Sequence, residues 1–590
     1  MSVTSPAAGA VVIPEADAKV PHNSVAEVDE AVAAVAARKD DWLALDLDAK
    51  IMLLDQTIHD TVRAAEEWSD ASLPVRGLTP DMPAAAEEIA TGPLQIVRHA
   101  RLLRDALRSI RDTGDVKLPQ APTTRPDGQV VVPVFPTSRL DAATFVGTKA
   151  EVWMEPHVGL DTLQTATLYK DPPSTGKVCF VIAAGNFAAS GPSDAFTKLF
   201  NEGEVCVIKM NPVNEHLGRF IERAMTPFIR EGFVRIVYGG IEIGKHLTNH
   251  PDVDTIHMTA SDKTHDAVVF GVGDEGAQRK AANEPVLDKP VTSELGAINP
   301  VIVVPGEWSE VDIAYQGKQL ASMLMMNAGF TCLCPRVIIT HADWPQRDAL
   351  LDAIRASLAE APERHPYYPG ARQRWELFLD AHPEAETYGD TADGKVPWTL
   401  IPGLDHTNDD EMAFKVEAFN GVFTEMPVGG ATVADYLDTV TDFCNDTLWG
   451  TLSASIFVHP TTLKEPAADA AVDRMIARLR YGTIGLNTWA GTGYGLMSTT
   501  WGAFPGHPLN DVQSGRGVVH NTYMLEAPQK TVIRAGFRMG KKPPMSYDWT
   551  TFPSLIRRLL KLEAYGQWRQ LPGIVKDGIC LLYTSPSPRD

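Results

Sequence analysis

The stretch Val178-Cys179-Phe180-Val181-Ile182-Ala183 is a short apolar run that leads into Ala184-Gly185-Asn186-Phe187. An apolar run of this length with glycine close by is typical of a buried strand. Segments with strand-like and helix-like patterns continue to alternate along the chain, at residues 193–200, 204–208, 215–228, 234–237 and 251–259. This alternation predicts the α/β fold class, with a parallel sheet between residues 176 and 300.

Ligands of parallel α/β sheets bind beyond the carboxyl ends of the strands, where helix N-termini offer backbone N–H groups to phosphates. In this sequence those strand ends carry residues 184–187, 209–212 and 259–261. A separate Gly271-x-Gly273-x-x-Gly276 match has Glu294 near the distance of a ribose-binding acid. The segment that follows the match contains Asn283 and ends in a proline, so we interpret the match as a glycine-rich loop.

The candidate nucleophile is Cys332, in Asn327-Ala328-Gly329-Phe330-Thr331-Cys332-Leu333-Cys334-Pro335-Arg336. It lies between a helix-compatible apolar run, residues 320–326, and a strand-like run, residues 337–340. The reactive form is the thiolate, so a catalytic role requires dipoles, a charge or a nearby base. Taken by itself the segment fits a small buried cysteine better than a nucleophile.

Composition restricts the classes of protein to consider. The 590 residues are 44% hydrophobic and 22% charged, which predicts two or three globular domains, and the net charge of −22 argues against nucleic acid as a partner. No apolar run is long enough to cross a bilayer. The cysteines form no metal-type cluster with histidines, so we expect no metal and a reduced, cytoplasmic protein. The six cysteines are Cys179, Cys206, Cys332, Cys334, Cys444 and Cys580.

Several motifs in order resemble the aldehyde dehydrogenase superfamily. They are Asn-Ala-Gly-x-x-Cys at residues 327–332 with Arg336, and Glu294-Leu295-Gly296-Ala297-Ile298-Asn299-Pro300 before it; the resemblance extends over residues 178–517. It implies that Cys332 is the nucleophile and that Glu294 is the general base. It also implies that Asn186, with the backbone N–H of Cys332, stabilises the oxyanion.

The resemblance implies NAD or NADP as the cofactor. Lys209 resembles the lysine at the adenosine ribose, and Glu417 and Phe419 resemble the pair beside the nicotinamide ribose. Ser261 lies in a sequence similar to the phosphate turn of the family, and Ala184 lies at the strand end of the same site. The alternative interpretations are a surface lysine, a solvated glutamate and an ordinary helix N-cap.

This sequence also departs from the family pattern. Phe330 stands where glutamine is usual, and Ala297 and Ile298 replace glycine and lysine. Pro212 replaces the glutamate that makes a second ribose contact, which leaves the choice between NAD and NADP open. His265 replaces the second glycine of the phosphate turn.

The resemblance implies a Rossmann-like cofactor domain, an α/β catalytic domain and a small β oligomerisation element. We expect the NAD(P)-binding domain at residues 25–113 and 174–300, the oligomerisation arm at 114–173 and 488–530, and the catalytic domain at 301–487. Outside these we expect a mobile N-terminal arm at 1–24, a C-terminal extension at 531–579 and a disordered or non-native tail at 580–590.

The expected reaction oxidises a small-molecule aldehyde to a carboxylic acid through a cysteine thiohemiacetal and a thioester. The alternatives are an acylating dehydrogenase that uses coenzyme A and a non-catalytic nucleotide-binding or structural relative. We expect a homodimer or homotetramer. Four aromatic residues, Phe330, Trp449, Trp489 and Trp501, suggest an apolar entrance, and Cys334 is interpreted as a packed neighbour.

Overall fold

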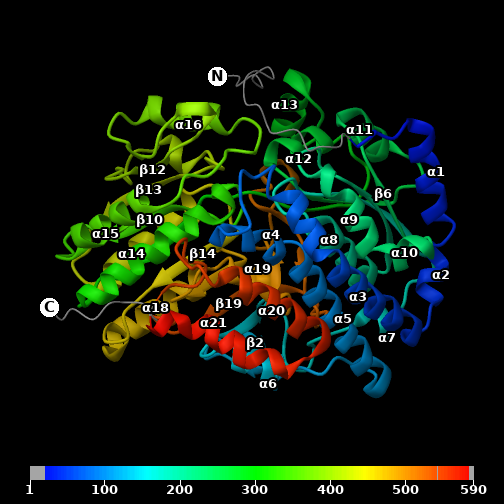
Figure 1. Cartoon of the computed structure of the whole chain (residues 1–590), viewed down its shortest axis with the longest axis horizontal. Helices are drawn as coiled ribbons and strands as arrows, with labels where there is room; N and C mark the ends of the chain where they lie inside the picture. The colour runs from blue at the N-terminus through cyan, green and yellow to red at the C-terminus, as the bar shows by residue number, and fades with distance from the viewer. Residues whose placement is uncertain (1–19, 541, 584–590) are drawn as a thin grey trace.

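The computed structural model describes residues 20–540 and 542–583 (Figure 1). Most of the predicted N-terminal arm, residues 1–19, lies outside the described residues. The described part contains an eleven-stranded sheet, a six-stranded sheet and a two-stranded sheet. Both large sheets carry helices on their faces, and the mixed α/β architecture predicted from the sequence is confirmed.

The six-stranded sheet has the order β17-β8-β7-β4-β5-β6. Five of its strands run parallel, and the antiparallel β17 lies at one edge. Burial on both faces explains why these strands read as continuous apolar runs. The bounds are β4 (Lys177–Ile182), β5 (Glu204–Lys209), β6 (Val234–Val237), β7 (Thr255–Thr259), β8 (Val291–Glu294) and β17 (Gly515–Arg516).

The eleven-stranded sheet has the order β1-β2-β3-β19-β15-β14-β9-β10-β13-β12-β11. Its parallel centre is β9 (Asn299–Val303), β10 (Pro335–His341), β12 (Trp398–Ile401), β13 (Val422–Val428), β14 (Ser453–Phe457) and β15 (Thr483–Leu486), with β11 (Glu386–Tyr388) antiparallel at one edge. The other side is β1 (Thr123–Thr124), β2 (Val130–Phe135), β3 (Lys149–Met154) and β19 (Pro528–Arg534).

Strand β19 joins the predicted arm to the catalytic strands within one chain. It pairs in parallel with β15 from Thr483↔Thr531 to Leu486↔Arg534, and on its other side it pairs antiparallel with β3. The residues of the expected oligomerisation arm, β1 to β3, therefore extend the catalytic sheet of the same chain. A role of this arm in subunit contact stays a prediction.

Helices from both ends of the chain pack together. The N-terminal helices are α1 (Val25–Ala36), α3 (Leu47–Ser72), α4 (Ala86–Ala90) and α5 (Pro93–Thr113), and α1 packs against β5 and β6. The C-terminal α20 (Phe552–Tyr565) packs against α3, α4 and α5 (Figure 1).

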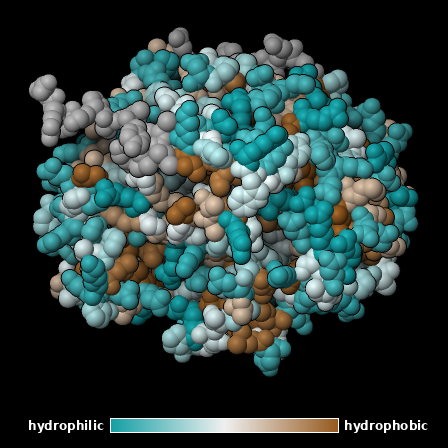
Figure 2. Space-filling model, turned by 60° about the horizontal axis from the view of Figure 1, so that its bottom comes forward, coloured by the Kyte–Doolittle hydropathy of each residue, from teal (hydrophilic) through white to brown (hydrophobic). Residues whose placement is uncertain are grey.

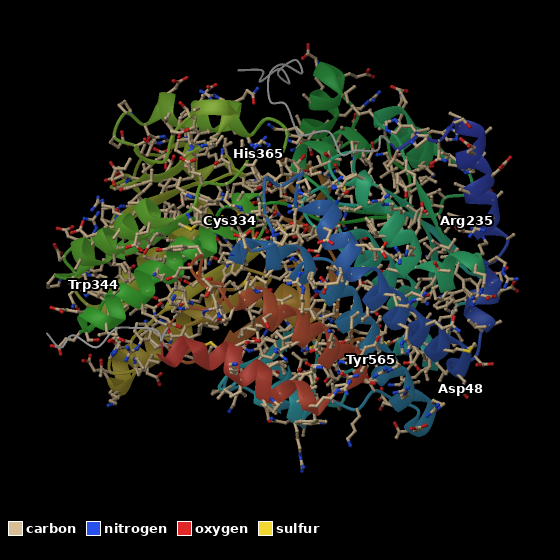
Figure 3. All side chains as sticks on the ribbon, viewed as in Figure 1. Asp48, Arg235, Cys334, Trp344, His365 and Tyr565 are labelled. Atoms are coloured by element: carbon tan, nitrogen blue, oxygen red, sulfur yellow. The ribbon has the colours of Figure 1, made fainter. Side chains whose placement is uncertain are left out.

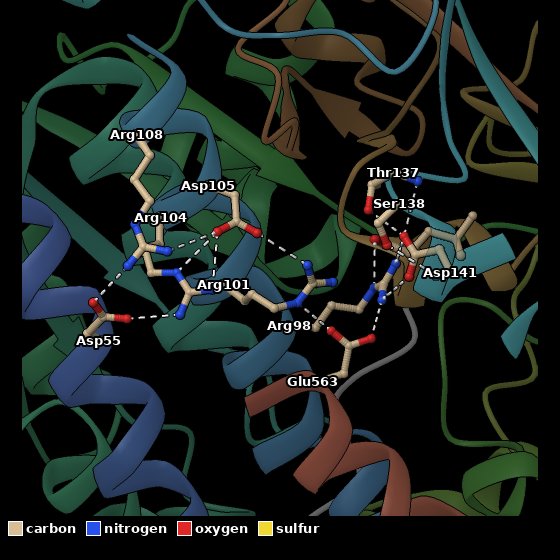
Figure 4. Close-up of polar contacts among 11 residues, drawn as sticks. Asp55, Arg98, Arg101, Arg104, Asp105, Arg108, Thr137, Ser138, Asp141 and Glu563 are labelled. Carbon is tan, nitrogen blue, oxygen red and sulfur yellow. Dashed lines mark hydrogen bonds and ion pairs between the residues drawn. The ribbon is translucent and has the colours of Figure 1, made fainter. Parts of the chain in front are cut away.

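A buried arginine cluster attaches α20 to the N-terminal helices (Figure 4). Arg98 of α5 is 4% exposed and forms ion pairs with Asp141 of α6 (Arg139–Thr144) and with Glu563 of α20. The neighbouring Arg101 donates to the second oxygen of Glu563 at 2.7 Å. Because a buried charge without a partner is strongly unfavourable, these pairs couple the C-terminal extension to the rest of the fold.

The structure contains two short helices, α7 (Thr167–Lys170) and α19 (Thr492–Leu496), and it corrects one sequence expectation. The Gly271-x-Gly273-x-x-Gly276 match begins a helix, α13 (Gly273–Ala282). Asn283 is the left-handed cap that ends this helix, with φ 53°, and not a residue that prevents it.

The predicted C-terminal tail is partly helical. Helix α21 (Leu571–Tyr583) includes residues 580–583, and residues 584–590 lie outside the described part. The expectation of a disordered or non-native tail stays a prediction. The face shown in Figure 2 is mainly hydrophilic, with small apolar patches between charged groups. Within the described residues, we find no helix with the length and apolar character needed to cross a membrane.

We expect Gly515→Ala to destabilise the junction of the two large sheets. Gly515 pairs with Glu294 and has a φ of 120°, and a Cβ at this position would lie 2.0 Å from the carbonyl oxygen of Ser293. The strained backbone and the clash together should lower the free energy of unfolding by about 3 kcal/mol or more, measured by denaturant titration.

The matched control is Gly495→Ala in α19, where no atom lies within 4 Å of the added Cβ. Equal midpoints for Gly515→Ala and the wild type would contradict the expected close packing of β17 on β8.

Candidate active site

The turn that carries Cys332 has an unusual backbone. It connects α14 (Glu310–Met325) to β10, and the consecutive residues Asn327, Ala328 and Gly329 have φ values of 52°, 54° and 79°. A residue other than glycine held in the left-handed region costs about 1–3 kcal/mol. Such a turn persists only where the surrounding structure holds it in place.

The side chain of Asn327 supplies much of that restraint. Its Nδ2 donates to the carbonyl oxygens of Asn186, at 3.2 Å, and Phe330, at 2.9 Å. Its Oδ1 accepts from the hydroxyl of Tyr367 at 3.0 Å, and its backbone N–H donates to Glu87 Oε2 at 3.1 Å. Asn327 thereby connects the loop after β4, the Cys332 turn and the N-terminal helices.

Two further side chains hold the turn from the other side. Arg336 donates to the carbonyl oxygens of Gly329, at 2.8 Å, and Asn420, at 2.7 Å. Asn299 Nδ2 donates to the carbonyl oxygen of Cys332 at 2.6 Å. In Figure 3 the labelled Cys334, two residues beyond Cys332, lies near the middle of the molecule.

The structure brings Cys332 and Glu294 together. The thiol is half-buried and lies close enough to the Glu294 carboxyl group, which is 3% exposed at the end of β8, for each group to shift the pKa of the other. Trp501 Nε1–H donates to Glu294 Oε1 at 3.1 Å. A nucleophile and a base in contact, with the base oriented by a third group, form the arrangement needed for nucleophilic catalysis.

Burial sets the protonation of both groups. It raises the pKa of Glu294 to about 7, although hydrogen bonds from Trp501 and Cys332 oppose this effect. Burial also raises the pKa of the Cys332 thiol well above its usual range, and the nearby charge of Glu294 raises it further. The resting cysteine is therefore a thiol, and Glu294 has the proton affinity of a base that works near neutral pH.

Two hydrogen-bond donors near this pair have no partner among the described residues. Asn186 is 6% exposed, and its Oδ1 accepts from the backbone N–H of Phe187 at 3.1 Å, which leaves the side-chain N–H₂ group free. The backbone N–H of Cys332 is also free, whereas the neighbouring Leu333 N–H is bonded to Thr331. Free donors on these two loops are suited to stabilise a developing oxyanion.

The structure brings together only two of the four aromatic residues that were predicted at the entrance of the site. Trp489 and Trp501 belong to the apolar cluster against which Cys332 packs, and Tyr494 lies between Phe187 and Trp501, with ring centroids 5.7 and 5.6 Å away. The other two predicted residues lie elsewhere. Phe330 packs in a separate cluster with Tyr367 and Tyr368, and Trp449 packs in the interior of the catalytic sheet.

Glu417 has the features expected of a ribose-binding carboxylate. Burial raises its pKa to about 7, and its Oε1 is buried without a hydrogen-bond partner among the described residues. Arg336 lies 3.6 Å from Oε1, and a Cβ on Gly296 would lie 2.0 Å from Oε2. A buried acceptor without a donor fits a hydroxyl group of a bound nucleotide.

The other predicted cofactor residues lie on three separate segments of the chain. Lys209 ends β5, is 8% exposed and donates to the carbonyl oxygen of Met210 at 3.4 Å. Phe419 follows Glu417 with a φ of 43°. Ser261 caps α12 (Asp262–Val269), accepting from the backbone N–H of Thr264 at 3.2 Å.

Ala184 has no free backbone group for a cofactor. Its N–H donates to Ser190 Oγ at 3.0 Å, and its carbonyl oxygen accepts from Asn214 Nδ2 at 2.9 Å. The prediction that Ala184 binds the cofactor therefore has no backbone donor or acceptor to support it.

Some residues near the site were missed because no local motif marks them. Asp194 is 2% exposed, accepts from the hydroxyl of Thr259 at 2.8 Å and helps to raise the pKa of Glu294. Tyr368 lies beside Phe419, with the two ring centroids 5.0 Å apart. Arg76 comes from the N-terminal helices, far away in sequence, so only the folded chain brings it to the Cys332 turn.

One group outside this site has metal-type side chains. Asp29, His246 and His250 place possible ligand atoms within 4.8 Å of one another. His250 Nδ1 accepts from the backbone N–H of Asp252 at 3.1 Å, so its Nε2 carries the ring proton. This Nε2 lies 3.4 Å from Asp29, and the arrangement is that of a hydrogen-bonded pair joining α1 to α11 (Ile241–Asn249).

Proteins similar in sequence to this chain are named as semialdehyde dehydrogenases. The model of the aldehyde dehydrogenase family matches residues 140–367. An N-succinylglutamate 5-semialdehyde dehydrogenase from Sphingopyxis alaskensis is 26% identical over 32% of this chain and 36% of its own length. A 2-aminomuconic 6-semialdehyde dehydrogenase from Pseudomonas sp is 26% identical over 43% of this chain and 48% of its own. The chain thus matches less than half of these curated relatives.

Solved structures share the fold over most of the chain. An aldehyde dehydrogenase C from Pseudomonas syringae, complexed with NAD+ and octanal, has a TM-score of 0.58 and 18% identity, over 88% of this chain and 90% of that one. An NADP-dependent glyceraldehyde-3-phosphate dehydrogenase from Bacillus halodurans, complexed with NADP, has a TM-score of 0.56 and 16% identity, over 87% and 92%. Residues 140–367 of this chain are therefore similar to the aldehyde dehydrogenase family, and the fold over most of the chain is shared with these solved structures.

We expect Glu294→Gln to stabilise the protein at pH 8 but not at pH 4.5. Between about pH 4.5 and pH 7 the folded protein binds more protons at Glu294 than the unfolded chain does, so this residue lowers stability as pH rises through that window. The uncharged glutamine removes the penalty, which should raise the free energy of unfolding at pH 8 by up to about 3 kcal/mol.

Denaturant titrations at the two pH values test this expectation. Glu417→Gln should behave in the same direction, because burial also raises the pKa of Glu417 to about 7. A change of equal size at both pH values would show that the substitutions act through packing and not through the charge.

Proposed function

We propose that this chain is an NAD(P)-dependent aldehyde dehydrogenase that oxidises an aldehyde to a carboxylic acid. The observation that carries the proposal is the contact between the Cys332 thiol and Glu294, whose pKa is about 7. The match of residues 140–367 to the aldehyde dehydrogenase family supports it, as do the relatives named as semialdehyde dehydrogenases. A structural protein would have no need for a nucleophile, a base and free oxyanion donors in one buried site.

In the proposed reaction Glu294 accepts the thiol proton as Cys332 Sγ adds to the aldehyde carbon. The carbonyl π electrons move to oxygen, and the Asn186 amide and the Cys332 backbone N–H stabilise the oxyanion. Loss of hydride from carbon leaves a thioester on Sγ. After Glu294 has released the thiol proton to solvent, it takes a proton from water as the water oxygen adds to the thioester carbon. The C–S bond then breaks, the carboxylic acid leaves, and Glu294 returns its proton to the Cys332 thiolate.

A bound nicotinamide supplies the hydride acceptor. Glu417 would hold ribose hydroxyl groups through its unpartnered buried oxygen, with Phe419 beside it, and Lys209 would contact the adenosine side from the end of β5. Ser261, at the N-terminus of α12, would face the pyrophosphate. We assign Lys209 and Ser261 to a cofactor domain at residues 25–113 and 174–300, and Glu417 and Phe419 to the catalytic domain at residues 301–487. Either NAD or NADP is compatible with the residues present.

The second candidate is an acylating dehydrogenase that passes the acyl group to coenzyme A. Glu294 favours hydrolysis instead, because it gives water a base next to the thioester carbon. For the assembled protein we propose a cytoplasmic homodimer or homotetramer, which light scattering after gel filtration tests directly.

The activity test is a panel of aliphatic and aromatic aldehydes with NAD and with NADP, followed by the absorbance of the reduced nicotinamide. Cys332→Ala should abolish turnover. Asn186→Ala should lower kcat by about 100-fold, because one oxyanion donor contributes about 3 kcal/mol. Activity should fall below about pH 7 as Glu294 becomes protonated.

Cys334→Ala is the matched control, since this buried thiol makes sulfur contacts only with backbone carbonyls and should be dispensable for turnover. Turnover that appears only after coenzyme A is added would favour the acylating alternative. Nucleotide binding by calorimetry without turnover of any aldehyde would contradict the proposed reaction.

A further inference from the structure

Arg76 connects the two loops that carry the oxyanion donors. It lies just beyond the C-terminal end of α3, is 5% exposed and donates through Nη2 to the carbonyl oxygen of Asn186 at 3.2 Å. Its Nη1 donates to Asn327 Oδ1, the side chain that restrains the Cys332 turn. One guanidinium group therefore contacts both the loop after β4 and the catalytic turn.

Arg76 is itself held in a single position. Its Nε pairs with Glu88 at 3.2 Å, and its guanidinium lies over the ring of Tyr367, 4.1 Å from the centroid. The Tyr367 hydroxyl donates to the same Asn327 oxygen at 3.0 Å. A planar guanidinium with pre-set donors is well suited to fix the distance between two backbone segments.

Arg76 belongs to a buried cluster in which positive and negative side chains are equal in number. The pairing of these charges keeps the cluster stable away from water. Glu87, from the same helix α4 as Glu88, pairs with Arg364 at 2.9 Å and accepts the backbone N–H of Asn327. Two arginines and two glutamates from three separate segments thus surround the Asn327 turn. A buried charge that lost its partner here would be strongly unfavourable, which keeps the four side chains together.

We propose that Arg76 is a positioning residue for the oxyanion site: it fixes Asn186 relative to Cys332 by bridging the two loops that carry them. The inference rests on the proposed function of Cys332 and Asn186. Oxyanion stabilisation depends steeply on donor placement, and a displacement of about 1 Å is enough to lower a rate by about 100-fold. Arg76 touches neither the nucleophile nor the reacting carbon, so its effect is transmitted through Asn186 and Asn327.

Two reactions of Cys332 distinguish a positioning role of Arg76 from a general effect of Arg76 on the stability of the fold. Acylation by p-nitrophenyl acetate places negative charge on the carbonyl oxygen and needs no nucleotide, whereas alkylation by iodoacetamide displaces iodide at carbon and develops no oxyanion. Arg76→Lys keeps the charge but cannot bridge two acceptors with a planar fork. We expect it to slow acylation by about 100-fold and to change alkylation by less than about threefold.

The matched control is Arg98→Lys, because Arg98 is also a fully buried arginine paired with two carboxylates, but it lies in the α5–α20 cluster of Figure 4. The Arg98→Lys variant should have a lower melting temperature than the wild type. Its ratio of acylation rate to alkylation rate should stay at the wild-type value. Tyr367→Phe is a milder test, which removes only one hydrogen bond to Asn327 and should lower the same ratio by about 3- to 10-fold.

The proposal is overturned if Arg76→Lys lowers both reactions equally, or if Arg98→Lys lowers the ratio as much as Arg76→Lys does. If Arg76→Lys does not fold, an unchanged ratio in Tyr367→Phe overturns it. A wild type that acylates and alkylates but reduces no nucleotide with any aldehyde would contradict the proposed dehydrogenase while leaving this inference open to the same ratio test.

Discussion

The left-handed turn at Asn327, Ala328 and Gly329 is the constraint on which the site depends. Two of these three residues have side chains that disfavour the conformation, so the turn exists only because its neighbours hold it. Asn327 and Arg336 satisfy its carbonyl oxygens and those of adjacent loops. Among the described residues the Cys332 backbone N–H beyond this turn has no hydrogen-bond partner.

The site lies where the two large sheets meet, and each sheet contributes a different part. Glu294 ends β8 of the six-stranded sheet, next to the edge strand β17, while Cys332 precedes β10 of the eleven-stranded sheet. The N-terminal helices form a third side through Arg76 and Glu87. The position of Glu294 relative to Cys332 therefore depends on how the two sheets and the N-terminal helices pack. Small shifts where they meet would change this position.

Burial of the two glutamates lowers the stability of the folded state near neutral pH, but it gives both carboxyl groups properties that suit the proposed reaction. Both Glu294 and Glu417 have pKa values raised to about 7 by removal from water, so near neutral pH the folded state is penalised for each charge. The same burial makes Glu294 a base of useful strength and leaves Glu417 with an acceptor oxygen that no described residue satisfies. Functional sites commonly contain groups that a purely structural core would not tolerate.

Local patterns in the sequence were sufficient for the α/β alternation and for Cys332 as a candidate, because apolar periodicity acts over neighbouring residues. Glu294 and Asn186 became candidates only through the resemblance to a known family. They misjudged α13, where Asn283 ends a helix through a left-handed cap, and they missed Arg76 and Asp194, which no motif marks. Burial decided the pKa values, and pairing of β19 with β15 decided where the predicted arm lies. Both are contacts between residues far apart in the chain, which only the folded structure brings together.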